Sequence, residues 1–285
     1  MNILELTLLV SNISYECNEW ISRVKKDDNF NLEYYYCNII NINSIKFIRD
    51  GNLDMNIRYK QDQGLSNICT LKTSNYLIIA FSGLDNFRQV LNILDYFLIY
   101  NEMLECNIHR GFNYIMNNLL DEVRLIIDVY NCKNVLFTGH SLGGAIAKLM
   151  CLYFNKVKSC NFNCITYSCP LIGDETCIKK FNEYVKTTDN FLSADDFLVD
   201  LPYFRGSNLD TSYFIESSSI KKKNKIQLNY FKNILNFSST THRLNYLYRN
   251  LILNKKNLFL LNYKKYIKDP FSFKEYLKNQ EKYIN

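Results

Sequence analysis

Short apolar runs alternate with amphipathic stretches through the middle of the chain. The run from Asn75 to Phe81 is apolar and is closed by Ser82-Gly83, which is typical of a strand buried on both faces. From Asn113 to Tyr130, apolar residues recur at helical spacing with charged residues between them, so we expect an amphipathic helix. A second apolar run, from Lys133 to Thr138, predicts another buried strand.

The same alternation continues towards residue 193. A glycine-flanked turn leads into a helix-like stretch at Ala145–Met150, and both Asn163–Ser168 and Asn190–Ser193 have the pattern of strands. Between these two strands, Asp174–Tyr184 has the spacing of a helix. Because strands alternate with helices, we expect an α/β fold with a mostly parallel central sheet flanked by helices.

Length and composition indicate one domain. The chain has 285 residues, of which 47% are hydrophobic, and this is enough to bury a large core. No internal repeat or Pro- or Gly-rich linker divides it, so we expect a single domain over residues 1–285. Beyond Ser207 the chain becomes polar and Lys-rich, and we expect residues 247–285 to form a basic, helical C-terminal extension.

Positive charge is concentrated in the last quarter of the chain. From Glu216 onwards there are 15 Lys and Arg against 4 Asp and Glu, or +11, which leaves −5 of the total of +6 for the rest. Such a surface could attract anionic membranes or nucleic acid, or could simply be solvated. Since no aromatic-basic recognition motif accompanies it, we do not expect nucleic acid as a partner.

The apolar segments and the cysteines bear on the cellular compartment. No stretch approaches the roughly 20 apolar residues of a membrane-spanning helix, and the apolar start, Met1–Val10, lacks a basic region and contains Glu5. Ten cysteines are scattered without a CxxC pair, and no histidine lies near the tightest group, Cys160, Cys164 and Cys169. We therefore expect an intracellular protein with packed thiols and no zinc site, although secretion stays open.

One motif indicates a catalytic residue. Gly139-His140-Ser141-Leu142-Gly143 fits the GxSxG nucleophile elbow, in which a serine lies on a strained turn between a strand and a helix. The elements predicted on either side are the required strand and helix. We therefore expect Ser141 to be a catalytic nucleophile.

A serine nucleophile needs a base, which an acid orients. Three histidines are available, and His140 should point away from the turn while His109 precedes the elbow by a whole helix. In α/β-hydrolases the chain order is Ser, acid, His, so His242 is the expected base. For the acid, Asp195, Asp196 and Asp200 all follow the strand predicted to end near Ser193, and the order alone leaves them open.

From Tyr76 to Tyr246 the chain resembles the class 3 lipases, the fungal-lipase-like branch of the α/β-hydrolases. The blocks that carry the resemblance, in chain order, are Phe81-Ser82-Gly83-Leu84, Ile108-His109-Arg110-Gly111-Phe112, Thr138 to Ala145 (TGHSLGGA), Tyr167 to Asp174 (YSCPLIGD), Asp196 to Pro202 (DFLVDLP) and His242 to Tyr246 (HRLNY). In the family's acid block the first Asp is catalytic and a Pro follows six positions later. The resemblance thus implies Asp196 as the acid and supports His242 as the base.

The resemblance also implies an oxyanion hole and a lid. The hole would be formed by the backbone amides of Leu84 and Leu142, although Ser82 and Leu84 depart from the family's Phe-Arg-Gly-Ser/Thr and Leu84 has no hydroxyl. Leu84 to Tyr100 corresponds to the family's mobile lid, or else forms an ordinary core helix. Its expected lipid-contacting residues are Phe87, Val90, Leu91 and Leu94.

Together these features predict a serine hydrolase of lipid esters that needs no metal or organic cofactor and touches lipid interfaces transiently. A phospholipase or an acyltransferase could use the same triad. A non-catalytic lipid- or partner-binding protein is the other alternative, because of Ser82 and Leu84. The oligomeric state is not predicted.

Overall fold

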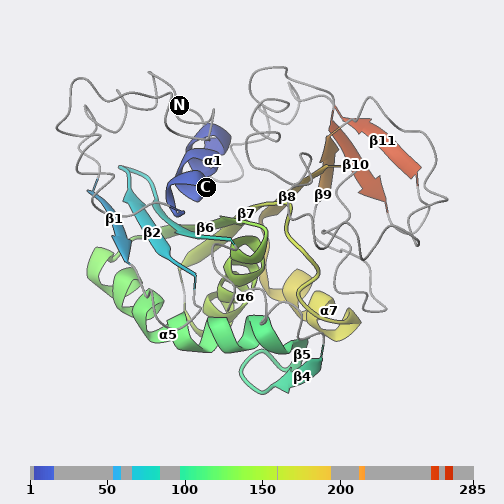
Figure 1. Ribbon diagram of the computed structural model, residues 1–285, viewed down its shortest axis with the longest axis horizontal. Helices are drawn as coiled ribbons and strands as arrows, with labels where there is room; N and C mark the ends of the chain where they lie inside the picture. Colours follow the sequence, from blue (N-terminus) through green and yellow to red (C-terminus); the bar gives the residue numbers. More distant parts are fainter. Residues whose placement is uncertain are drawn as a thin grey trace.

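A nine-stranded sheet forms the centre of the computed structural model, which describes residues 3–15, 54–58, 66–83, 97–158, 160–193, 212–215, 258–262 and 267–271. Its strand order is β1-β2-β3-β6-β7-β8-β9-β10-β11, and β4 and β5 form a separate pair (Figure 1). The strands are β1 (Asp54–Arg58), β2 (Ile68–Lys72), β3 (Leu77–Phe81), β4 (Leu98–Asn101), β5 (Cys106–His109), β6 (Asn134–His140), β7 (Asn161–Tyr167), β8 (Thr188–Ser193), β9 (Ser212–Ile215), β10 (Leu258–Asn262) and β11 (Ile267–Phe271).

The middle of this sheet is parallel, as the alternating pattern predicts. Strands β3, β6, β7, β8 and β9 each run parallel to their neighbours in that series. Antiparallel pairs extend both sides, with β1 and β2 on one and β10 and β11 on the other. All the parallel strands therefore end at one edge of the sheet, which is where chemistry gathers in α/β folds.

In the described part of the chain, the helices that cover the sheet are α1 (Ile3–Ile13), α5 (Arg110–Tyr130), α6 (Leu142–Val157) and α7 (Glu175–Tyr184). Strands β3, β6, β7 and β8 are added in one direction, so right-handed crossovers place α5, α6 and α7 on the same face. Helix α1 lies on the opposite face, against β2, β3, β6 and β7 (Figure 1). The sheet is thus covered on both sides.

The core follows the two-residue period of the strands. Phe81 and Phe137 point to the side of α5 and α6 and stack with ring centroids 6.2 Å apart, and Phe137 also stacks on Phe154 of α6 at 5.9 Å. On the other face, Thr138 points to α1 and is hydrogen-bonded to Ser11 at 3.0 Å. The predicted strands and helices from β3 to β8 are confirmed with small shifts of their ends.

Helix α1 is an element that the sequence pattern does not predict. Its sequence, ILELTLLVSNI, is largely apolar, and nine of its eleven residues are buried, so burial is not confined to one stripe. It is joined to the sheet by polar contacts as well, since Thr7 is hydrogen-bonded to the Tyr167 hydroxyl at 2.7 Å. Among the described residues, no helix is both long and apolar enough to cross a bilayer.

The expected helical C-terminal extension is wrong where the structure describes it. Two stretches of it, β10 and β11, are antiparallel strands that continue the central sheet beyond β9. The run Leu-Phe-Leu-Leu at residues 258–261 is short and uninterrupted, which suits a strand better than a helix. Pro270 lies in β11, the last strand of the sheet, where a missing backbone donor is tolerated.

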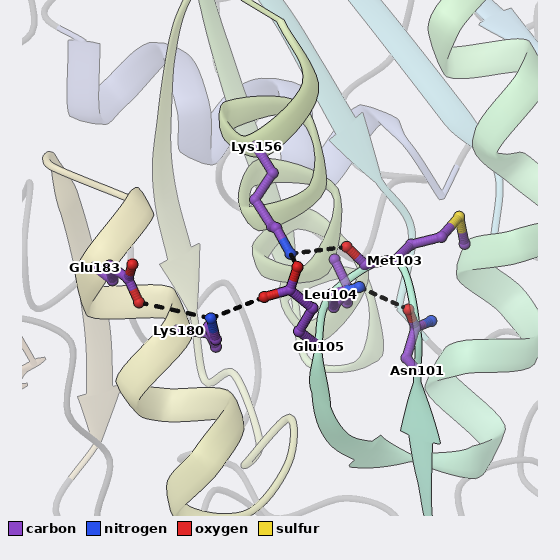
Figure 2. A network of polar contacts seen from close by, with 7 residues as sticks. All are labelled: Asn101, Met103, Leu104, Glu105, Lys156, Lys180 and Glu183. Atoms are coloured by element: carbon purple, nitrogen blue, oxygen red, sulfur yellow. Dashed lines mark hydrogen bonds and ion pairs between the residues drawn. The ribbon is translucent and has the colours of Figure 1, made fainter.

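The β4–β5 pair is fixed to the helices by an ionic network (Figure 2). Glu105 binds Lys156 of α6 at 3.2 Å and Lys180 of α7 at 2.9 Å, and these two lysines hold the pKa of its carboxyl below the ordinary value. Lys156 also donates to the carbonyl of Met103 at 3.0 Å. The end of the segment expected to be a lid or helix, Leu98–Asn101, is therefore a strand in an anchored hairpin.

Asp174 caps the N-terminus of α7 and ties it to β5. Its carboxylate accepts hydrogen bonds from the backbone N–H groups of Thr176 and Cys177 at 2.9 and 3.3 Å, and from the Asn107 side chain at 2.9 Å. Desolvation raises the pKa of this carboxyl. These hydrogen bonds and one from the Thr176 hydroxyl together have the larger effect, so the pKa is lower than that of an ordinary aspartate. The ionised form is therefore the one that stabilises the fold.

We expect Asp174→Ala to lower the free energy of unfolding at pH 7 by about 1 kcal/mol, the usual cost of losing an N-cap. The difference from the wild type should be full above about pH 4, the pKa of an aspartate in an unfolded chain, and should vanish as the pH falls through the lower folded-state pKa. Urea unfolding between pH 7 and pH 3 measures it. Asp121→Ala is the control, because that carboxylate is 93% exposed in its pair with Arg124 and should matter by less than about 0.5 kcal/mol. Equal losses in the two variants would contradict the capping role.

Candidate active site

Ser141 lies on a sharp turn between β6 and α6, at the edge where the parallel strands end. Its backbone has φ 56° and ψ −124°, the mirror image of an extended conformation, which residues other than glycine rarely adopt. The turn is held from both sides, because the Ser141 N–H donates to the carbonyl of Tyr167 at 2.9 Å and its own carbonyl accepts from Gly144 at 2.9 Å. The predicted strand, strained turn and helix of a nucleophile elbow are therefore confirmed.

Two glycines allow this turn to pack against its neighbours. A Cβ atom at position 143 would lie 2.0 Å from the carbonyl oxygen of Phe81, and one at position 139 would lie 2.4 Å from the backbone of Gly143. The first contact brings the start of α6 against the end of β3, and the second closes the turn itself. The glycines of the motif are thus required by close approach of backbones rather than by their flexibility.

The two histidines before or within the elbow have other partners, as expected. The imidazole of His140 is hydrogen-bonded through Nδ1 to the Tyr15 hydroxyl at 2.8 Å, on the side of the sheet that α1 covers. His109 caps α5, where its Nδ1 accepts from the backbone N–H of Phe112 at 3.3 Å and its ring stacks on that of Phe112. His140 is thus bonded to Tyr15, and His109 to the start of α5.

The backbone around Leu142 suits an oxyanion. Leu142 is the first residue of α6, so its amide belongs to a helix N-terminus, where the helix dipole favours negative charge. On the neighbouring strand, Ser82 is fully buried and paired with Asn67: its N–H donates to the Asn67 carbonyl at 3.0 Å, and its hydroxyl accepts from the Asn67 N–H at 2.9 Å. The small residue at position 82 therefore has a structural role.

Several expected site residues lie outside the described part of the chain. These are Leu84 of the oxyanion hole, the acid Asp196 with its alternatives Asp195 and Asp200, the base His242, and the lid residues Phe87, Val90, Leu91 and Leu94. Of the expected site residues, the structure describes Ser141 and Leu142, which are adjacent in the chain. The assignments of nucleophile, base, acid, oxyanion hole and lid stay predictions.

Tyr15 and Asn67 contact the elbow and β3 but carry no motif in the sequence. Both belong to segments far from Ser141 in the chain, and only the packing of α1 and β2 on the sheet brings them close. In the sequence, the apolar start of the chain indicates that this segment is buried, but not which part of the sheet it contacts. In the described segments, no group of three or more His, Cys, Asp or Glu side chains could hold a metal ion.

Comparison with known proteins agrees with this geometry. A model of the family described as Lipase (class 3) matches residues 78–206, which include the end of β3, the elbow and the expected acid. No curated protein matches the chain.

Solved structures that are similar to the chain include three lipases. The native Rhizomucor miehei lipase propeptide complex has a TM-score of 0.57 at 20% identity, over 77% of this chain and 71% of that one. A fungal lipase–inhibitor complex that gave a model for interfacial activation has a TM-score of 0.55 at 20% identity, over 75% and 79% of the two chains. A triacylglycerol lipase whose catalytic centre is a serine protease triad has a TM-score of 0.56 at 20% identity, over 76% and 80%.

At these identities the structural likeness establishes the fold, and the family model adds the sequence relationship. The residues matched by the family model include Ser141, the strained serine between β6 and α6. The chain therefore has the α/β fold of these lipases, and its residues 78–206 match the model of the class 3 lipase family.

Proposed function

We propose that this protein hydrolyses carboxylic esters of lipids, with Ser141 as nucleophile, His242 as general base and Asp196 as the acid that orients the base. The observation that carries the proposal is the backbone of Ser141, with φ 56° and ψ −124° between a buried strand and a helix. Holding a non-glycine residue in such a conformation costs on the order of 1–3 kcal/mol, and such strain concentrates at functional sites.

Chain geometry supports Asp196 as a partner. In the sequence Asp196 follows Ser193, the last residue of β8, by three positions, which corresponds to at most about 10 Å of extended chain at roughly 3.5 Å per residue. Strand β8 is two strands away from β6 in the sheet, or about 10 Å at 4.8 Å per strand. A histidine placed between the two could contact both side chains, and His242 is the histidine that follows Ser141 in the chain.

The reaction then proceeds in two halves. His242 takes the proton of the Ser141 hydroxyl as its oxygen attacks the ester carbonyl, and the amides of Leu142 and Leu84 stabilise the resulting oxyanion. Collapse of this intermediate expels the alcohol, which receives the proton from His242, and leaves an acyl group on Ser141. Water, activated by His242, attacks the acyl group and releases the fatty acid and the free serine.

The lipid nature of the substrate is supported by the expected lid and by the relatives. Phe87, Val90, Leu91 and Leu94 give the segment after β3 an apolar side that could meet acyl chains. One similar structure is described as a model for interfacial activation and another as a triacylglycerol lipase. The single domain and the intracellular location stay predictions, although β9 to β11 support one domain by continuing the central sheet.

Two measurements on the purified full chain test the proposal. A fluorophosphonate should label Ser141 stoichiometrically, and peptide mapping would locate the label. Incubation with triacylglycerol emulsions and with phospholipid vesicles should then release fatty acid from the triacylglycerol. Release from phospholipid instead would indicate a phospholipase, and transfer of the acyl group to an added alcohol would indicate an acyltransferase. A chain that is neither labelled nor active on any of these esters would be a binding protein, and the proposal would fail.

A further inference from the structure

The hydroxyl of Tyr15 lies between the end of β3 and the nucleophile turn. It is hydrogen-bonded to Nδ1 of His140, the residue before the nucleophile, at 2.8 Å. On the other side it touches Gly83, where an added Cβ atom would lie 2.0 Å from the Tyr15 hydroxyl and 2.8 Å from the carbonyl oxygen of His140. The side chain thus fills the space that the glycine leaves and contacts both backbone segments that lead to the expected oxyanion donors.

A chain of buried hydrogen bonds fixes Tyr15 in this place. The carbonyl of Ser14 accepts from the Asn67 side-chain amide at 3.2 Å, and Asn67 is paired through its backbone with Ser82, the residue before Gly83. Ser14, Asn67 and Ser82 are all at most 2% exposed. Since these partners are buried and mutually bonded, the position of Tyr15 relative to β3 is set before any substrate binds.

We propose that Tyr15 is a positioning residue for ester hydrolysis at Ser141, acting by holding the end of β3 against the nucleophile turn. The inference rests on the proposed function, in which the amides of Leu84 and Leu142 stabilise the oxyanion. Leu84 directly follows Gly83, and Leu142 is two residues after His140, so Tyr15 packs against the residue before one expected donor and is bonded to the side chain of a residue just before the other.

The test compares Tyr15→Phe with the wild type on a short-chain nitrophenyl ester, with active sites counted by fluorophosphonate titration. Because an oxyanion donor contributes about 10²-fold or more and misplacement by about 1 Å has a similar cost, we expect kcat per titrated site to fall about tenfold to hundredfold. KM should stay within about twofold, since the hydroxyl does not bind the ground state of the ester. The rate constant of fluorophosphonate labelling should fall in parallel with kcat.

Thr7→Val is the matched control, because it removes another buried hydroxyl contact between α1 and the sheet, the bond to Tyr167. It should lower the unfolding temperature and leave kcat per titrated site unchanged. If Tyr15→Phe behaves in the same way, with fewer titratable sites but wild-type kcat per site, the residue is only structural and the inference is overturned. If the wild type itself neither labels nor turns over ester, the proposed function fails, and the inference fails with it. An active wild type with an equally active Tyr15→Phe refutes the inference alone.

Discussion

Replacing Ser141 with alanine is expected to lower kcat for a short-chain nitrophenyl ester by at least about 10⁴-fold. In serine hydrolases, removal of the nucleophile leaves only the catalysis that binding and the oxyanion hole provide, and losses reach about 10⁶-fold. The strained turn presents Ser141 at the N-terminus of α6, and the residue is 9% exposed. Initial rates measured on titrated protein give the ratio.

Replacing the same residue with glycine separates the chemical role of Ser141 from its conformational cost. Ser141→Gly should be as inactive as Ser141→Ala, yet we expect it to be more stable than the alanine variant by about 1 kcal/mol. The reason is that φ 56° with ψ −124° is accessible to glycine and strained for alanine, a gain that exceeds the entropic penalty of glycine. Thermal or urea unfolding of the two variants measures the difference.

Ser168 provides the control for both variants. It follows β7 as Ser141 follows β6, also has a positive φ, at 47°, and is fully buried. Ser168→Ala should keep its fluorophosphonate labelling and most of its turnover, because its hydroxyl has no part in the proposed reaction. Retention of ester turnover by Ser141→Ala, or loss of labelling only in Ser168→Ala, would reject Ser141 as the nucleophile.

Local signals explain why the centre of the fold is predictable from the sequence. Strand β3 is an uninterrupted apolar run, β6 contains the apolar run Val135-Leu136-Phe137, and α5 has a clear helical period. The glycines of the GxSxG motif indicate where backbones must approach closely. Each of these features is decided by neighbours in the chain. The position of Ser141 between a strand and a helix follows from them without any knowledge of long-range contacts.

Other parts depend on partners that are distant in the chain. Helix α1 is buried on nearly every side and its polar Thr7 and Ser11 contact the sheet, so its sequence lacks the amphipathic pattern that would predict a helix. Strands β10 and β11 form through pairing with β9 and with each other, which a short apolar run alone does not specify. The role of Tyr15 at the site is equally hard to predict from the sequence, because its partner His140 is 125 residues away in the chain. For His242 and Asp196, chain order and family resemblance supplied the assignment.

The closest backbone contact at the elbow, that of Gly143 with Phe81, predicts a second mutation with a large effect. Gly143→Ala is expected to lower the free energy of unfolding by about 3 kcal/mol or more and kcat per active site by at least about 10²-fold. The added Cβ would lie 2.0 Å from the carbonyl oxygen of Phe81 and 2.7 Å from its carbon, and backbone atoms cannot turn aside as a side chain can. Helix α6 must therefore move away from β3, which displaces the Leu142 amide from the reacting carbonyl.

Gly144→Ala is the comparison that makes this test specific. Its added Cβ would lie 2.9 Å from the Cβ of Cys169 and 3.2 Å from the carbonyl oxygen of Gly139, so smaller shifts accommodate it. Both glycines are in the same helix, where alanine normally stabilises by about 1 kcal/mol, and helix propensity therefore predicts the same gain for each. The free energy of unfolding and kcat per titrated site should instead be highest in the wild type, lower in Gly144→Ala and much lower in Gly143→Ala. If Gly143→Ala matched the wild type in both measurements, α6 would not be held against β3 at this point, and the geometry of the elbow would have to be wrong.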